Sequence, residues 1–134
     1  MKALKLASLV MVTGISMGVS LANASMALAI PKDASGKVGH TISISSMYQY
    51  NIENNTSSFQ NYTGFEELEV NGKKHQNPIN FSLPAYGRKQ VNGDMISFGY
   101  MPDQVGDSII RSSIKIMGMN GSAHNAHSTL TVSN

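Results

Sequence analysis

Hydrophobic and polar residues alternate with a period of two along much of the chain. In the clearest run, residues 41–53, mostly polar side chains hold one parity and the other parity holds Ile42, Ile44, Ser46, Tyr48, Tyr50 and Ile52. Successive side chains of a β-strand point to opposite faces, whereas a helix would scatter these residues around its axis. The pattern predicts a long strand with one buried face, or two strands bent near Ser45 and Ser46.

Later segments repeat this alternation, with turn signals between them. Residues 59–70 are extended, with Gly64 interpreted as a β-bulge. Asn71-Gly72 and Asn92-Gly93 predict hairpin turns, because a type I′ turn needs positive φ at both central residues. The inward parities of the remaining segments contain Ile79, Phe81 and Leu83; Ile96, Phe98 and Tyr100; Ile110, Ser112, Ile114 and Ile116; and Leu130 and Val132.

Outside the first 29 residues, no window shows the 3.6-residue period of an amphipathic helix. Parallel neighbours need crossovers of a dozen or more residues, so the short connections favour antiparallel pairing. We therefore expect an all-β fold, an antiparallel immunoglobulin-like β-sandwich of about seven strands. Its predicted core comprises Ile42, Ile44, Ile52, Leu83, Ile96, Phe98, Ile114, Ile116, Leu130 and Val132.

The middle of the chain carries a resemblance that points to the same fold. The segment Tyr48-Gln-Tyr-Asn-Ile-Glu-Asn-Asn-Thr56 runs from a strand into a polar turn, and Phe81-Ser-Leu-Pro-Ala-Tyr-Gly87 ends a later strand in Leu-Pro-x-x-Gly. In these two respects, residues 48–87 resemble exported immunoglobulin-like modules. The resemblance implies a fold and carries no functional residue across.

The first 29 residues have the layout of a secretory signal peptide. Lys2 and Lys5 precede an uncharged apolar run, and small-x-small cleavage sites end at Ala24 and Ala29. We expect a signal peptide at residues 1–24, or alternatively 1–29; an uncleaved membrane anchor is the other interpretation. The rest of the chain is expected to form a flexible N-terminal arm at residues 25–40 and a β-sandwich domain at residues 41–134.

The amino-acid composition limits the compartments and the kinds of functional site that the protein can have. The 134-residue chain has no cysteine, which excludes disulfides, thiolate metal sites, a cysteine nucleophile and lipoprotein attachment. Without Lys2 and Lys5, eight basic residues balance eight acidic ones, so the domain lacks the electrostatic footprint of a nucleic-acid binder. Small secreted domains usually carry disulfides, so an exported domain without cysteine favours a bacterial envelope or secreted protein.

Two histidines and two methionines near the C-terminus are candidate metal ligands. His124 and His127 lie in a segment of small polar residues that we predict to be a loop, and Met117 and Met119 precede it on one predicted strand face. Imidazole and thioether are both copper ligands, so a His/Met site at the end of the sandwich is sterically reasonable. The alternative is that the methionines fill the end of the core and the histidines are solvated.

Glu66, Glu67 and Glu69 form an acidic cluster on one predicted strand. Adjacent residues of a strand point to opposite faces, so Glu67 and Glu69 share a face and Glu66 does not. Paired carboxylates serve in glycoside hydrolysis and in calcium binding. We instead expect a solvated strand face that opposes Lys73 and Lys74 across the Asn71-Gly72 hairpin, because opposite charges facing each other support strand pairing.

The remaining histidines and the tyrosines have simpler interpretations. His40 and His75 are isolated in the sequence and are expected to be surface residues. Any tyrosine that points outward would contribute to a contact surface typical of binding modules. Tyr48 and Tyr50 share the parity of the buried isoleucines, so we expect both in the core.

The sequence contains no nucleophile elbow, phosphate loop, His-Glu-x-x-His motif or dinucleotide fingerprint. We expect a non-catalytic binding or structural module without a cofactor, located in the periplasm or outside the cell. Its expected partner is an envelope or extracellular protein or glycan, with no nucleic acid and no stable membrane span after cleavage. The alternative function is a periplasmic copper-binding protein that uses the His/Met loop, and the third is an extracellular hydrolase.

Overall fold

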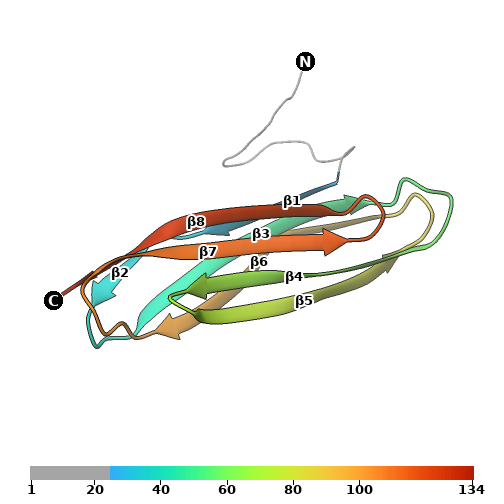
Figure 1. Ribbon diagram of the computed structural model, residues 1–134. Coiled ribbons are helices and arrows are strands. Elements are labelled where there is room, and N and C mark those ends of the chain that lie inside the picture. Colours follow the sequence, from blue (N-terminus) through green and yellow to red (C-terminus); the bar gives the residue numbers. More distant parts are fainter. Residues whose placement is uncertain (1–24) are drawn as a thin grey trace, which may run out of the picture.

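A computed structural model describes residues 25–134, and the predicted leader at residues 1–24 lies outside this range. The described chain forms eight β-strands and no helix (Figure 1). Within this range, no helix has the length and apolar character needed to cross a membrane. The strands are β1 (Met26–Pro31), β2 (Ala34–Lys37), β3 (Ile42–Glu53), β4 (Gln60–Val70), β5 (Lys73–Leu83), β6 (Arg88–Tyr100), β7 (Gly106–Met117) and β8 (Ser122–Ser133).

The strands form two sheets that pack face to face. Sheet A has the order β1-β3-β6, and sheet B has the order β2-β8-β7-β4-β5. The chain changes sheets between β1 and β2, β2 and β3, β3 and β4, β5 and β6, and β6 and β7. Crossings of this kind between two sheets are typical of Greek-key connections. The all-β, immunoglobulin-like β-sandwich predicted from the sequence is therefore confirmed.

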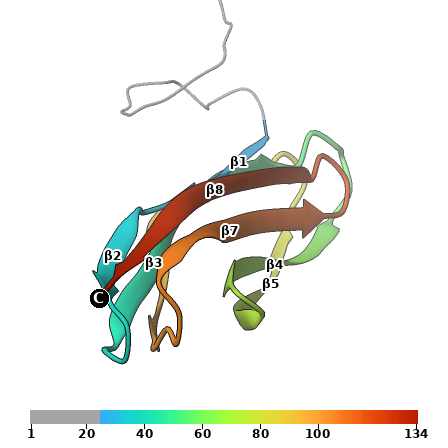
Figure 2. The same ribbon diagram turned by 60° about the vertical axis from the view of Figure 1, so that its left-hand side comes forward.

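One strand pair departs from the antiparallel arrangement that we expected. β2 runs parallel to β8, and Ala34 to Lys37 pair with Leu130 to Ser133 (Figure 2). The expectation came from the short connections between consecutive strands. β2 and β8 lie at opposite ends of the domain sequence, so nearly the whole domain serves as their connection and either direction is possible.

The flexible N-terminal arm predicted for residues 25–40 is wrong, because this segment forms β1 and β2. β1 pairs with β3, where Ala27 opposes Tyr50 and Ala29 opposes Tyr48. Both alanines are buried, and their small side chains leave room for the two tyrosine rings. The small residues of this segment match a signal-peptide cleavage site in sequence, but in the sandwich the same residues pack in the core.

All ten predicted core residues are buried between the sheets, with exposed fractions of 0–8%. The parity argument also placed Tyr48 and Tyr50 correctly in the core. Further buried apolar residues that the predicted core did not include are Ala27, Ala29, Tyr62, Leu68, Val70, Ile79 and Ile110. Burial of these side chains from both sheets supplies the main force that holds the layers together.

A short chain of hydroxyl groups crosses the core between the sheets. Ser46 of β3 lies 2.6 Å from Ser112 of β7, between their Oγ atoms. The Ser112 hydroxyl lies 2.9 Å from the Tyr48 hydroxyl, which donates to the carbonyl oxygen of Glu67 at 2.6 Å. Every member has a partner, so these buried polar groups fix the register of the two sheets without a large desolvation cost.

Two glycine-based predictions need correction. The β4–β5 and β4–β7 registers run through Gly64 without a shift, so Gly64 is not a bulge. Asn92-Gly93 is not a hairpin turn, because both residues lie inside β6. The register of β3 with β6 shifts opposite them, and Gly93 has a φ of 81°. Gly93 therefore has the positive φ that the sequence predicted, but it lies in a β-bulge and not in a hairpin turn.

The hairpin predicted at Asn71-Gly72 is confirmed between β4 and β5. Asn71 and Gly72 have φ angles of 48° and 84°, as a type I′ turn requires. The Asn71 side chain also donates hydrogen bonds to the Tyr100 and Ser108 hydroxyls, each at 3.0 Å. The turn is therefore anchored to the strands beside it.

Candidate functional site

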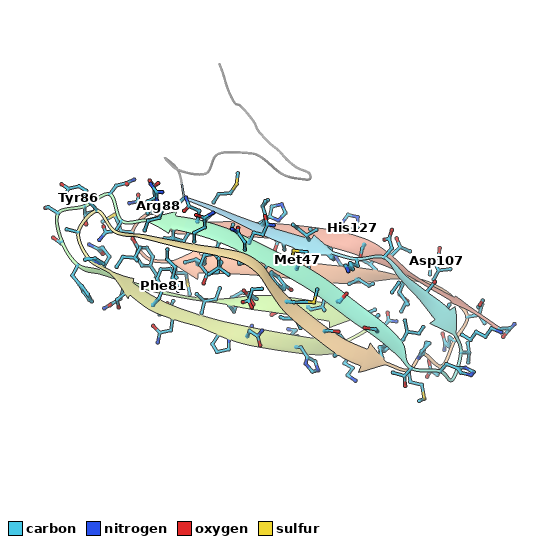
Figure 3. All side chains as sticks on the ribbon, turned by 180° about the vertical axis from the view of Figure 1, so that it is seen from behind. Met47, Phe81, Tyr86, Arg88, Asp107 and His127 are labelled. Atoms are coloured by element: carbon cyan, nitrogen blue, oxygen red, sulfur yellow. The ribbon has the colours of Figure 1, made fainter. Side chains whose placement is uncertain are left out.

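The structure does not bring the proposed His/Met ligands together. His124 and His127 lie in β8, not in a loop, and their separation of three residues places them on opposite faces of the strand. His124 faces the interior side with Ser128 and Leu130, whereas His127 is exposed beside Arg111. Two imidazoles on opposite faces of one strand cannot ligate a single ion. Figure 3 labels His127.

The two methionines lie outside β8, the strand that contains both histidines. Met117 is the last residue of β7 and Met119 lies in the following turn, and about half of each side chain is exposed. Residues 25–134 contain no cluster of three or more His, Cys, Asp or Glu residues that could hold a metal ion. The placement of His124, His127, Met117 and Met119 therefore gives no support to the copper-binding alternative.

His124 instead contacts the edge of sheet A. The backbone N–H of Ala29 in β1 donates a 3.0 Å hydrogen bond to Nδ1 of His124. This bond needs a neutral imidazole, and burial lowers the pKa of His124 below its usual value. Together with Ser128, whose hydroxyl donates to the carbonyl oxygen of Lys32 at 2.7 Å, His124 fastens β1 to β8 along one side of the sandwich.

We expect acidification to weaken this fastening. Because the folded-state pKa of His124 is depressed, its contribution to stability is present above the unfolded value of about 6.5 and is lost as pH falls through the folded value. Between pH 7 and pH 5, the free energy of unfolding measured with urea should fall less in His124→Gln than in wild type. His127→Gln, on the exposed face, is the control and should keep the full loss. Equal losses in all three proteins would contradict this assignment.

The acidic cluster divides between two environments. Glu67 lies on the outer face, where Oε1 accepts a hydrogen bond from Gln76 at 3.0 Å and Oε2 lies 3.8 Å from Nζ of Lys74. This pairing across the β4–β5 hairpin matches the expectation of a solvated, charge-paired strand face. Glu66 lies on the opposite face of the strand, as its parity predicted, and its side chain points into the core and is only 1% exposed.

The surroundings of Glu66 are unusual for a carboxyl group. Neither of its oxygen atoms has a hydrogen-bond partner of normal geometry within the described chain. Burial, together with the Asp94 carboxylate, raises the pKa of Glu66 to about 8, and Asn77 partly opposes the shift. Parity could have located this residue, because Glu66 shares the inward positions of Tyr62, Leu68 and Val70.

The outer face of sheet A is the most distinctive surface of the domain. A row of apolar side chains crosses all three strands, since Ile30 pairs with Met47 and Met47 pairs with Met95. Ile30 and Met95 are 42% and 47% exposed. We call these three residues, together with Leu28 beside Ile30, the apolar row. Figure 3 looks at the molecule from behind, where Met47 is labelled on β3.

The apolar row lies on a surface without charge. From Ser43 to Gln49 on β3 and from Met95 to Gly99 on β6, the outward positions carry no charged side chain. The outer face of sheet B differs sharply, because its outward positions include Glu67, Glu69, Lys74, Arg111 and Lys115. Depletion of charge and enrichment in methionine are features of the centre of a protein interface.

Two other surface features are weaker candidates. An open depression of about 400 Å³ lies where the chain passes from β1 to β2, lined by Lys32, Lys37 and His40 among others. Its carboxylate, Asp33, already accepts a hydrogen bond from the Thr129 N–H at 2.9 Å. This lining holds no pair of groups arranged for acid–base chemistry.

The second feature is the loop end of the sandwich, where Tyr86 is 73% exposed (Figure 3). Tyr86 has a φ of 59°, which is uncommon for a residue with a bulky side chain. Its N–H donates to the carbonyl oxygen of Thr56, and the Asn54 amide donates to the carbonyl oxygens of Ser58 and Pro84. The two loops are thus tied to each other, and Tyr86 is the tyrosine that the structure turns outward.

No family model and no curated protein matches this sequence. Among solved structures, the chain is similar to the ASH/PapD-like domain of human CEP192 (PapD-like domain 7), with 10% identity and a TM-score of 0.41 over 92% of this chain and 96% of that one. It is also similar to Spo0M, a sporulation control protein from Bacillus subtilis, with 12% identity and a TM-score of 0.31 over 84% of this chain and 50% of that one. At these identities, no functional residue is carried across from either protein.

Proposed function

We propose that this protein is an exported, non-catalytic β-sandwich that acts as a binding or structural module in the bacterial envelope or outside the cell. The observation that carries the proposal is the apolar row, with the uncharged outward positions around it on sheet A. Burying the apolar row and its uncharged neighbours against a partner removes apolar surface from water without desolvating a charge. The partner is an envelope or extracellular protein or glycan.

The structure bears on where the leader would be cleaved. β1 begins at Met26, and its Ala27 and Ala29 are core residues opposite Tyr50 and Tyr48. Cleavage after residue 29 would remove most of β1 and leave a cavity in the core. Cleavage after residue 24 leaves the whole strand, and the Ser25 hydroxyl remains to accept a 3.1 Å hydrogen bond from the Glu53 N–H.

We therefore expect the exported protein to begin at Ser25. Intact-mass analysis of protein recovered from the periplasm or medium of the expressing bacterium measures this directly. A mass that corresponds to a start at Ile30 would contradict the assignment of β1 to the mature domain. Retention of Met1 would contradict the proposed leader itself.

The binding proposal is tested by placing charge on the apolar row. A Met47→Glu/Met95→Glu variant should lose partners that wild type captures from an envelope extract, by at least about tenfold, because two buried charges would be unpaired in the interface. The matched control is Ile109→Glu/Met117→Glu, which changes two exposed apolar residues on the outer face of sheet B.

Captured proteins are identified by mass spectrometry, and urea unfolding verifies that both double variants fold. Loss of capture in the sheet A variant alone supports the proposal. Equal capture by both variants and wild type, or equal loss in both variants, would assign binding to another part of the surface.

A further inference from the structure

The side chain of Glu66 lies between the two sheets, near residues from four other strands. Asn77 of β5 is its cross-strand neighbour, and Asp94 of β6 faces it from sheet A. Tyr48 and Tyr50 of β3 are close enough for the Glu66 charge to affect their hydroxyl groups. On its other side β4 pairs with β7, whose residue opposite Glu66 is the apolar Ile114. On β6, Nζ of Lys89 lies over the Phe81 ring, 5.8 Å from its centroid, and the ion pairs of the described structure do not include Glu66.

An ionised Glu66 does not suit this position. Its side chain is 1% exposed and neither oxygen has a hydrogen-bond partner of normal geometry, so a negative charge there would be poorly solvated, and the Asn77 side chain compensates only in part. The lysines at the start of β5 have other partners, because Lys74 pairs with Glu67 and Nζ of Lys73 donates to the carbonyl oxygen of Gly99 at 2.8 Å. The charge that does approach Glu66 is the carboxylate of Asp94, which has the same sign.

A proton on Glu66 removes both difficulties. The neutral carboxyl group has a small desolvation cost, and its O–H donates a hydrogen bond to the Asp94 carboxylate. We infer that Glu66 keeps a proton at neutral pH and shares it with Asp94, so that the pair forms a proton-dependent link between sheet B and sheet A. The link joins β4 to β6 on the side of the sandwich opposite His124, and its loss is expected to loosen the β5–β6 side.

The other titratable groups nearby do not change this assignment. Burial raises the pKa values of Tyr48 and Tyr50 above 10, so both hydroxyls stay neutral through the range in which Glu66 titrates. His75, two residues from Asn77 on β5, stacks on Phe98 with a centroid distance of 4.5 Å. His124, on the opposite side, titrates below about pH 6.5.

The inference fixes the sign of the pH dependence. Because the folded-state pKa of Glu66 lies above its unfolded value, the stabilisation is complete below the unfolded pKa and is lost as pH rises through about 8. Between those values the folded state binds one more proton than the unfolded state. The unfolding equilibrium constant should therefore rise about tenfold per pH unit between pH 6.5 and 7.5, and level off above pH 8.

Urea unfolding of wild type and Glu66→Gln across pH 6.5–9 tests the link. Glutamine keeps the shape and a donor toward Asp94 but cannot ionise, so the tenfold rise should disappear in this variant. Glu69→Gln, on the outer face of the same strand, is the matched control and should retain the full rise. An unchanged rise in Glu66→Gln would overturn the inference.

A second measurement does not depend on the variant folding well. Infrared spectra of wild type at pH 7 should contain the C=O stretch of a protonated carboxylic acid, and the band should disappear as pH is raised to 9. Asp94→Asn should move this titration to lower pH, because the neighbouring negative charge is gone. Absence of the band at pH 7 would overturn the inference.

A metal cation bound between Glu66 and Asp94 is the alternative to a shared proton. Calcium chloride added to wild type and to Glu66→Gln at pH 7.5 distinguishes the two, because a cation held by the pair would stabilise wild type alone. We expect no difference between the two proteins. A calcium-dependent rise in melting temperature that Glu66→Gln lacks would show that the pair holds a metal ion and would overturn the inference.

Discussion

Replacing Gly64 by alanine is expected to destabilise the domain by about 3 kcal/mol or more. A Cβ at this position would overlap the carbonyl oxygen of Lys115 and lie 3.0 Å from Cα of Ile116. Both atoms belong to the backbone of β7, the strand that pairs with β4 at this point. A flexible side chain can move away from a new methyl group, but here two paired strands would have to separate. The measurement is urea unfolding of the purified variant.

Gly99→Ala is the matched control for this substitution. Gly99 also lies inside a strand, yet a Cβ there would meet only the methyl group of Thr41, at 2.8 Å. That methyl group belongs to an exposed side chain that can rotate, so we expect a loss of about 1 kcal/mol or less. Equal losses in the two variants would show that β4 and β7 are not as close at Gly64 as described.

Truncation of Ile114 to alanine should cost about 2–5 kcal/mol. Ile114 is 1% exposed and lies in β7 opposite Glu66 of β4, in the middle of the core. The loss combines the transfer energy of the removed methyl and methylene groups with the cavity that the surrounding strands cannot fill. A typical domain has a total stability of about 5–15 kcal/mol, so this substitution removes a large share of it.

Ile109 provides the control on the same strand. Its side chain faces outward and is 49% exposed, so Ile109→Ala should change the free energy of unfolding by about 0.5 kcal/mol or less. Denaturant melts of both variants under the same conditions give the comparison. A loss below about 0.5 kcal/mol for Ile114→Ala would show that this face of β7 is not buried.

Strand parity made most of the core predictable. Ile42, Ile44 and Ile52 alternate with polar neighbours, and such alternation has one physical solution in a sheet with one buried face. Glu66 obeys the same rule: its parity placed it on the face opposite Glu67 and Glu69, but the burial of an acidic side chain on that face was not predicted. A charged residue on an inward parity is a signal in its own right.

Other features depend on contacts between residues far apart in the sequence, which a local pattern of residues does not predict. His124 receives its hydrogen bond from Ala29, 95 residues away in the sequence. The His/Met hypothesis relied on residues that are close in sequence, yet the β7–β8 hairpin sets His124 and His127 on opposite faces. Gly64 lacks a side chain because the backbone of β7, which is also distant in sequence, packs closely against it. In each case the tertiary partner decides what the residue does.

The pairing of β2 with β8 has a consequence for how the protein is made. Residues 34–37 are among the first of the domain to be synthesised, and residues 130–133 are among the last. Their ladder closes a loop of nearly the whole domain, and contacts of such long sequence separation form slowly because chain entropy opposes them. Sheet B therefore stays incomplete until the final strand has left the ribosome. For a protein that we propose to be exported, late closure of this edge would favour translocation before the fold is complete.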